Sequence, residues 1–398
     1  MAYIEISLSG RERQVKEQPL YRPWNPWGEL TEEAQRFLKR LLEAGMEEEV
    51  RECVGAAHYE RTPERRAYRK GYYERGLMTS LGHISLRVPR LRGGGYRGTL
   101  LQAYQRRHAS FDRAVLECFL AGESTRNAGR VKGLARRSGM SRQTVSRIPS
   151  QVDSAARAYH SRRLEDKYAA IILDGLWVKV KRSCVCKMVL LTALGITAHG
   201  KQEIVGFRLA RGESSGEWER FICDLHRRGL EGDALRVVVH DQCGAIEGAI
   251  RLVWPQVGSQ LCVFHKLASA REQVRRQCNK KAFVRDAAEI WRQGSAEKAV
   301  SVLECVVARW REVEPAAVRA LLRGLPDTLA FYDLPERMWP LVRTTGRLER
   351  FHRELRRRTR PLGAFANPRS CERIIYSSVA VYNQNPEVLL NSLFAHNS

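Results

Sequence analysis

The sequence contains no run of 18 consecutive apolar residues, so we expect no membrane-spanning helix. Its first residues lack the basic start and the apolar stretch of a secretory signal. No Gly-x-x-x-x-Gly-Lys-Ser/Thr motif occurs, which argues against a P-loop for nucleotide phosphates. The ten cysteines form no Cys-x-x-Cys pair and no disulfide-like framework, so a zinc knuckle is not supported and we expect free thiols in a reducing compartment.

Acidic residues are scarce relative to basic ones, with 44 Asp and Glu against 68 Lys and Arg. The resulting net charge of +24 and isoelectric point near 10 usually indicate a polyanionic partner, most often nucleic acid. The alternative is a basic surface that only faces solvent. The 398 residues, 43% of them hydrophobic, are enough for roughly two to four domains with a sizeable buried core.

The first 110 residues combine a helical pattern with a basic, tyrosine-rich segment. Apolar residues recur at helical spacing over residues 31–53, after a loop rich in proline and tryptophan. Residues 56–110 begin with basic residues interleaved with tyrosines, and the alternation over residues 84–88 predicts a strand that ends at Pro89 and a glycine cluster. A strand with basic flanks suits contact with a DNA backbone; the alternative is a small solvated β-unit.

We expect residues 111–160 to be helical. A first helix is expected to end at Gly122, and Ser141 can cap a later helix that exposes Arg142, Gln143 and Arg147. A helix, a glycine-containing turn and a second basic helix resemble a helix-turn-helix, so we expect this segment to bind DNA. The alternative is that these short helices only pack against the rest of the protein.

From Lys167 the pattern changes to strands and helices in the order β-β-β-α-β-α-β-α. This order predicts an α/β core with a mixed sheet covered by helices. Residues 271–338 carry only helical signals. A strongly basic helix follows, with seven arginines between Arg347 and Arg360.

Two aspartates lie within or at the end of predicted core strands, and ligand sites in α/β sheets form at strand ends. Asp174 interrupts the apolar strand IILDGLWVKV, and Asp241 ends the apolar strand LRVVVHD. Burying an isolated carboxylate costs several kcal/mol, so each aspartate needs a partner. Two neighbouring carboxylates repel each other unless a cation lies between them, and Mg²⁺ is held by carboxylates, phosphate oxygens and water. Two such ions about 4 Å apart can stabilise the attacking and the leaving oxygen in phosphoryl transfer.

The third acid is expected from the basic helix. Glu349 stands among arginines that could grip a phosphodiester strand, with Arg350, Arg353, Arg356 and Arg357 as the expected DNA-binding residues of this helix. Glu354 is its rival, five positions on and on another face. Alternatively, Glu349 only forms a surface ion pair with Arg353 one turn away.

Cys262 and His265 have the spacing of half a zinc site. The sequence offers no second pair, so we favour packing or support of the acidic site over zinc binding.

The chain resembles bacterial insertion-sequence transposases of the mutator-like type, which carry an Asp-Asp-Glu triad. The resemblance runs from about Tyr59 to Ser378. It rests on the strings RKGYYERGLMTSLGHISLRVPRLRGG, FLAGESTRNAGRV, LDGLWVKV, RGESSGEWERFICDLHRRGL, CVFHK and TTGRLERFHRELRRRTRPLGAFANPRS, which are specific in combination.

The resemblance implies that Asp174, Asp241 and Glu349 are the catalytic, metal-binding acids. It assigns Cys262 and His265 to the family's Cys-x-x-His signature. It further implies an RNase H-like core, two Mg²⁺ or Mn²⁺ ions, terminal inverted repeats and target DNA as partners, and a homo-oligomer on DNA. The expected location is the bacterial cytoplasm, at the nucleoid.

These expectations divide the chain into regions. Residues 1–55 form an N-terminal helical segment, 56–110 a basic β-containing DNA-binding region and 111–160 a region like a helix-turn-helix. Residues 165–270 and 339–385 form the catalytic core, and 271–338 an all-helical insertion before the last catalytic helix. The alternative function is a catalytically inactive DNA-binding remnant or regulator; Gly346 stands where the family usually has Asn, and His240 where Ser is common.

Overall fold

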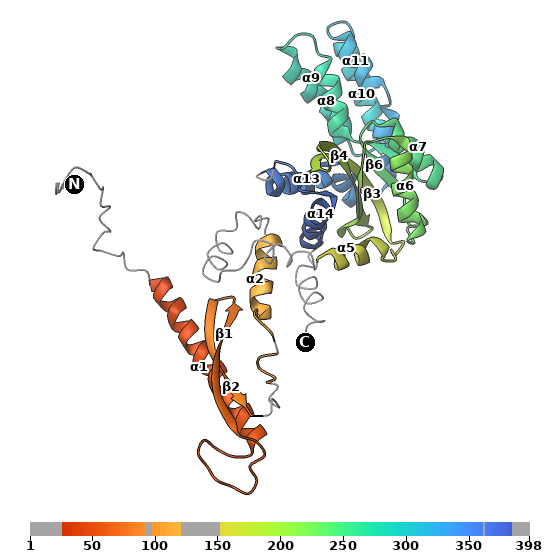
Figure 1. The fold of residues 1–398 in the computed structure, drawn as a ribbon. Helices are drawn as coiled ribbons and strands as arrows, with labels where there is room; N and C mark the ends of the chain where they lie inside the picture. The colour runs from red at the N-terminus through yellow and green to blue at the C-terminus, as the bar shows by residue number, and fades with distance from the viewer. Residues whose placement is uncertain (1–25, 93–97, 103, 121–151, 361–362, 384–398) are drawn as a thin grey trace, which may run out of the picture. The chain divides into compact units, whose positions relative to one another are not determined.

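The computed structural model describes residues 26–92, 98–102, 104–120, 152–360 and 363–383 (Figure 1). The chain divides into two compact units, unit 1 over Met1–Phe111 and unit 2 over Asp112–Ser398. No helix in the described ranges is both long and apolar enough to cross a membrane.

Unit 1 contains one long helix against a β-hairpin. Helix α1 (Pro26–Val54) begins five residues earlier than the apolar pattern predicts. Proline is well tolerated in the first turn of a helix, where its missing N–H has no partner to lose, so the expected Pro-Trp loop partly joins the helix. Met46 of α1 is buried against Leu77 and Leu86 of the hairpin, which gives this unit a small core of its own.

The hairpin consists of β1 (Arg69–Thr79) and β2 (Gly82–Leu91), which pair antiparallel. The sequence predicts only the second strand, and it wrongly ends that strand at Pro89, which lies inside β2 opposite Tyr72. A proline is tolerated in an edge strand or beside a bulge; both strands of this sheet are edges, and the register shifts next to Pro89, between Arg69 and Tyr72. Arg87 stacks on Tyr72, with the guanidinium carbon 4.7 Å from the ring centroid.

Helix α2 (Ala109–Leu120) agrees with the helix expected before Gly122. The predicted recognition residues Arg142, Gln143 and Arg147 lie outside the described residues.

Unit 2 is built on a five-stranded mixed sheet in the order β5-β4-β3-β6-β7. Its strands are β3 (Tyr168–Lys181), β4 (Val185–Thr197), β5 (Gln202–Ala210), β6 (Val237–His240) and β7 (Gly258–Leu261). The pairs β3–β4 and β4–β5 are antiparallel, whereas β3–β6 and β6–β7 are parallel. The expected α/β core with a mixed sheet and flanking helices is confirmed.

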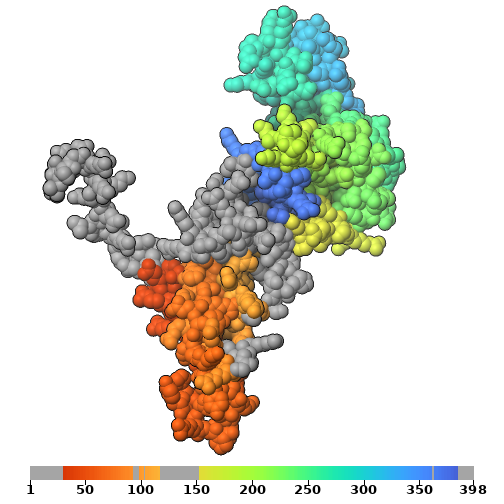
Figure 2. All heavy atoms as spheres, viewed as in Figure 1, coloured from red at the N-terminus to blue at the C-terminus, as the bar shows by residue number. Residues whose placement is uncertain are grey.

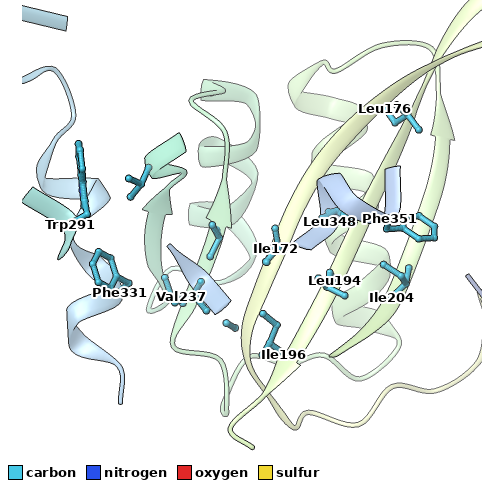
Figure 3. Packing of buried hydrophobic residues seen from close by; sticks show 14 of the residues in the cluster. Ile172, Leu176, Leu194, Ile196, Ile204, Val237, Trp291, Phe331, Leu348 and Phe351 are labelled. Atoms are coloured by element: carbon cyan, nitrogen blue, oxygen red, sulfur yellow. The ribbon is translucent and has the colours of Figure 1, made fainter. Parts of the chain in front are cut away.

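Helices cover both faces of this sheet (Figure 1). They are α5 (Val152–Ser161), α6 (Ser215–Arg227), α7 (Gly244–Val253), α13 (Gly346–Thr359) and α14 (Pro368–Tyr382), whereas α8 (Val263–Glu272) runs away from the sheet. Because side chains alternate along a strand, Ile171 and Leu173 of β3 pack on the α6 side and Ile172 on the α13 side. Figure 3 shows Leu348 and Phe351 of α13 near Ile172, on the α13 side of the sheet.

Between α8 and α13 the only regular elements are helices, which turns and short coil segments connect, as the sequence predicts. The longer helices are α9 (Asn279–Ala288), α10 (Ala296–Trp310) and α11 (Pro315–Leu322), and they form one end of unit 2 in the space-filling view (Figure 2). Short turns connect them to α12 (Trp339–Val342). Buried Gln260 of β7 donates to the Thr328 carbonyl and accepts from the Phe331 N–H, which ties this segment to the sheet.

Candidate active site

Asp174 lies on β3 just beyond the part of that strand that pairs with β6. The parallel pairing joins Ala170–Ile172 to Val237–Val239. Asp174 and Asp241 each come two residues after the last of these pairs, at the same end of the sheet. Alternation places the Asp174 side chain on the α13 face, and its carboxylate accepts a 2.8 Å hydrogen bond from the Gly175 N–H.

His352 fixes the other oxygen of the Asp174 carboxylate. Its Nδ1 lies 3.2 Å from Asp174 Oδ2, and its Nε2 lies 3.1 Å from the hydroxyl of Thr192. The His352 side chain is only 3% exposed, so these two contacts hold it in one orientation. Thr192 is the β4 partner of Asp174 in the sheet register, and sheet pairing and α13 therefore position the same carboxylate.

Asp241 follows the last residue of β6 directly. Buried His240 holds the backbone of Asp241 in place. Its Nδ1 lies 2.6 Å from the Asp241 carbonyl oxygen, and its Nε2 lies 2.8 Å from the Ser259 hydroxyl on β7. Burial lowers the pKa of His240, which keeps the ring neutral. The Asp241 carboxylate accepts the Gln242 N–H at 2.6 Å and is otherwise half-exposed, available to a ligand.

Glu349 lies in the first turn of α13. The Thr345 hydroxyl, at the start of the helix, donates to Glu349 Oε1 at 2.7 Å. The Thr345 backbone N–H points at Cys262 Sγ, 3.4 Å away. Thr345 thus connects Glu349 to the Cys-x-x-His segment, although 83 residues separate Cys262 from Thr345.

His265 lies between two of the acids. Its Nδ1 is 3.5 Å from Asp241 Oδ1, and its Nε2 is 3.9 Å from Glu349 Oε1. The hydrogen bond with Cys262 raises the pKa of His265 to about 9, and both carboxylates add to the increase. Burial alone would raise the pKa of the Cys262 thiol, but hydrogen bonds from His265 and Thr345 lower it overall. The proposed role of Cys262 and His265 in supporting the acidic site thus has a physical basis.

The rival acid and the simple ion pair do not fit this geometry. Glu354 accepts hydrogen bonds from Arg357 and Arg358, and these lower the pKa of its carboxyl to about 2. Glu349 pairs with His265, and among the described residues it forms no ion pair with Arg353.

Arginines on the exposed side of α13 border a groove. It has a volume of about 570 Å³ and lies between the end of β3 and α13. Its basic lining residues are Lys179, Arg353, Arg356, Arg357 and Arg360, and the half-exposed Trp177 also lines it. Arg350 is exposed one turn before Arg353 but is not part of this lining.

The three acids are suited to bind cations. Within the described residues their ion-pair partners are histidines alone, although the chain carries a net charge of +24. Oxygen ligands from Asp174, Asp241 and Glu349 are the kind that Mg²⁺ and Mn²⁺ prefer. Cys262, His265 and Glu349 also offer ligand atoms within 4.8 Å of one another, so the acidic site continues into the Cys-x-x-His segment.

A further carboxylate lies beside this site, and the sequence reasoning did not single it out. Glu213 comes just before α6, within the string RGESSGEW. Burial raises the pKa of its carboxyl, and the nearby charges of Asp174 and Asp241 raise it further. Thr192 and His352 were also missed, because they act through contacts between segments far apart in the sequence, and so was Thr345, which contacts distant Cys262 as well as nearby Glu349.

Known proteins match nearly the whole chain. The family model described as "Transposase, Mutator family" matches residues 29–386. The transposase for insertion sequence element ISRM5 of Rhizobium meliloti is 30% identical over 91% of this chain and 89% of that protein. The transposase for IS256 in transposon Tn4001 of Staphylococcus aureus is 30% identical over 86% of this chain and 88% of its own length. The same identity is found with the transposase for IS1081 of Mycobacterium tuberculosis, over 86% of this chain and 83% of that protein. The expected resemblance is confirmed: this chain belongs to the Mutator family of transposases.

Proposed function

We propose that this chain binds the terminal inverted repeats of its insertion sequence and cuts and joins DNA with two divalent cations, Mg²⁺ or Mn²⁺. Asp174, Asp241 and Glu349 would hold the cations. The observation that carries the proposal is that His265 lies between Asp241 and Glu349, that His352 of α13 pairs with Asp174, and that within the described residues these histidines are the only ion-pair partners of the three acids. An RNase H-like core is part of the proposal, supported by the order of three antiparallel strands followed by two parallel ones.

The chain's own residues prepare the reaction. His352 orients the Asp174 carboxylate, and Thr345 orients that of Glu349. Arg353 and Arg356, in the basic groove, would grip phosphates next to the cut. When bound, two cations would activate the attacking water and stabilise the leaving 3′-oxygen.

The chemistry balances without an external energy source. Water first breaks the phosphodiester at the element's end and leaves a 3′-hydroxyl and a 5′-phosphate. The 3′-hydroxyl then attacks a phosphodiester of the target DNA, so that one such bond forms as another breaks. We further propose that Arg142, Gln143 and Arg147 contact the repeats and that the protein works as a homo-oligomer on DNA.

The test is cleavage of a duplex that carries one end of the element. Asp174→Ala and Glu349→Ala should each abolish nicking and strand transfer in Mg²⁺ while still shifting the duplex in a binding gel. Glu354→Ala is the matched control on the same helix, and it should cut normally. Full activity of either triad variant would reject the assignment. Cleavage without strand-transfer products would make the protein a nuclease, and wild-type binding without cleavage in either metal would make it an inactive remnant.

A further inference from the structure

We propose that Glu213 is a fourth carboxylate of this site and helps to bind the divalent cations. The inference rests on the proposed function, because it assumes that Asp174, Asp241 and Glu349 hold cations. It adds a residue from the opposite face of the sheet to the three acids that reach the site from the α13 face.

The position of Glu213 follows from the connection between β5 and α6. The residue precedes Ser214, the N-cap of α6, and α6 packs on the face of the sheet away from α13. Alternation along β3 places Gly175 and Trp177 on this α6 face, whereas Asp174 points to the other. Beyond Ile172, β3 has passed the end of its pairing with β6, so carboxylates can approach this end of the sheet from both sides.

A glycine lets Glu213 come close. A Cβ added at Gly175 would lie 2.8 Å from Glu213 Oε1 and 3.0 Å from its Cδ, so a side chain at position 175 would require the Glu213 carboxylate to move. The Glu213 carboxylate therefore fills the space that a side chain at position 175 would take. The N–H of the same glycine donates to Asp174 Oδ1, so both carboxylates meet at one residue of β3.

The Glu213 carboxylate is oriented but not neutralised. Trp177 donates a hydrogen bond to it from the same face of β3. Throughout the part of unit 2 that the structure describes, no lysine or arginine forms an ion pair with it. By contrast Glu217, in the first turn of α6, pairs with Arg208 and Arg220. A chain with this excess of arginine thus leaves a fourth negative charge next to Asp174 and Asp241, an arrangement that a bound divalent cation would stabilise.

The experiment measures metal binding without DNA. Mn²⁺ would be titrated into the full-length protein and free Mn²⁺ followed by electron paramagnetic resonance, in wild type, Glu213→Gln and Glu217→Gln. Glu213→Gln should weaken Mn²⁺ binding by roughly tenfold, in the range found when groups around a metal site are removed. It should also raise the Mg²⁺ concentration needed for cleavage. Glu217→Gln, an acid-to-amide change in the first turn of α6, should leave both unchanged.

Gly175→Ala is the second variant, because it leaves the Glu213 side chain in place and displaces its carboxylate, while the new Cβ also lies 3.2 Å from Val189 Cγ2. It should weaken Mn²⁺ binding as Glu213→Gln does. Melting of the metal-free proteins separates this role from a structural one: Glu213→Gln removes repulsion and should melt no lower than wild type.

The outcomes distinguish the inference from the proposed function. If Asp174→Asn loses Mn²⁺ binding while Glu213→Gln binds as tightly as wild type, Glu213 is not a ligand and the three-acid site stands. If wild type itself binds no Mn²⁺ and cuts no DNA, the proposed function fails and the inference fails with it.

Discussion

Replacing His352 by phenylalanine should weaken the anchoring of the Asp174 carboxylate without leaving a cavity in the core. The Asp174 carboxylate has two anchors, the Gly175 N–H at 2.8 Å and His352 Nδ1 at 3.2 Å, and this substitution removes the second. Phenylalanine fills the buried volume but leaves Asp174 Oδ2 and the Thr192 hydroxyl without their partner. Loss of hydrogen bonds at such buried groups costs about 1–3 kcal/mol each.

The magnitude for catalysis follows from the role of His352 as a residue that orients a metal ligand. Removing such a residue typically lowers metal affinity or activity by about 10–100-fold, which corresponds to roughly 1.4–2.7 kcal/mol. Thr192→Val should have a smaller effect, of a few-fold, because the threonine only orients the imidazole ring. It lies opposite Asp174 and is fully buried.

The assay is the initial rate of cleavage of an element-end duplex as a function of Mg²⁺ concentration. His352→Phe should raise the half-saturating Mg²⁺ concentration, and Thr192→Val should shift it in the same direction. His226→Phe, at an exposed position on α6, is the matched control. A folded His352→Phe protein with the wild-type rate and Mg²⁺ requirement would refute the reasoning.

Three further predictions concern stability. Because the pKa of His265 is raised to about 9 from an ordinary value near 6.5, its stabilising contribution is complete below about pH 6.5 and is lost as the pH rises through about 9. The gap in melting temperature between metal-free wild type and His265→Gln should close over that range, and a constant gap would contradict the assignment. Buried Glu314 accepts hydrogen bonds from the N–H groups of Arg275 and Arg276 and from the Asn279 amide, so Glu314→Gln should lower the free energy of unfolding in urea by about 1–3 kcal/mol. Gly229 has φ +113°, and an added Cβ would lie 2.5 Å from a backbone oxygen, so Gly229→Ala should lower it by more than about 1 kcal/mol; an unchanged midpoint would show that the loop relaxes freely.

The spacing of apolar residues predicted most strands and helices of the core, because this spacing can be read within each segment alone. The continuous apolar runs of β3 and β6 indicate buried strands, and each aspartate interrupts or ends such a run, so it could be identified in one dimension. Strand β1 was missed because the charged and aromatic residues of RKGYYERGLMT do not alternate clearly, and they pair only because β2 follows a two-residue turn. The sequence reasoning also did not identify α14 as a separate helix.

The surroundings of the acids could not be predicted in the same way. Glu349 and Glu354 both lie on α13, and the local pattern left them as rivals. The family resemblance favoured Glu349, and in the structure Glu349 is the one that faces His265. Glu213 lies near Asp174 only because the chain returns across the opposite face of the sheet and meets a glycine there. These relations depend on how separate elements pack, and a pattern within one segment carries no trace of them. The DNA-binding residues of the predicted helix-turn-helix stay predictions.

The helical segment from α8 to α12 begins and ends at neighbouring positions, which contact each other. The Val263 N–H donates to the Arg343 carbonyl at 3.0 Å, next to the contacts between Cys262 and Thr345. The first and the last residues of the segment therefore lie next to each other. The entropic cost of bringing the ends of a segment together grows only slowly with its length. Insertions or deletions within this segment should therefore have little effect on the position of Glu349. The number of residues between Asp241 and Glu349 is thus free to vary, provided that the contacts of Cys262 and Val263 with Arg343 and Thr345 are kept.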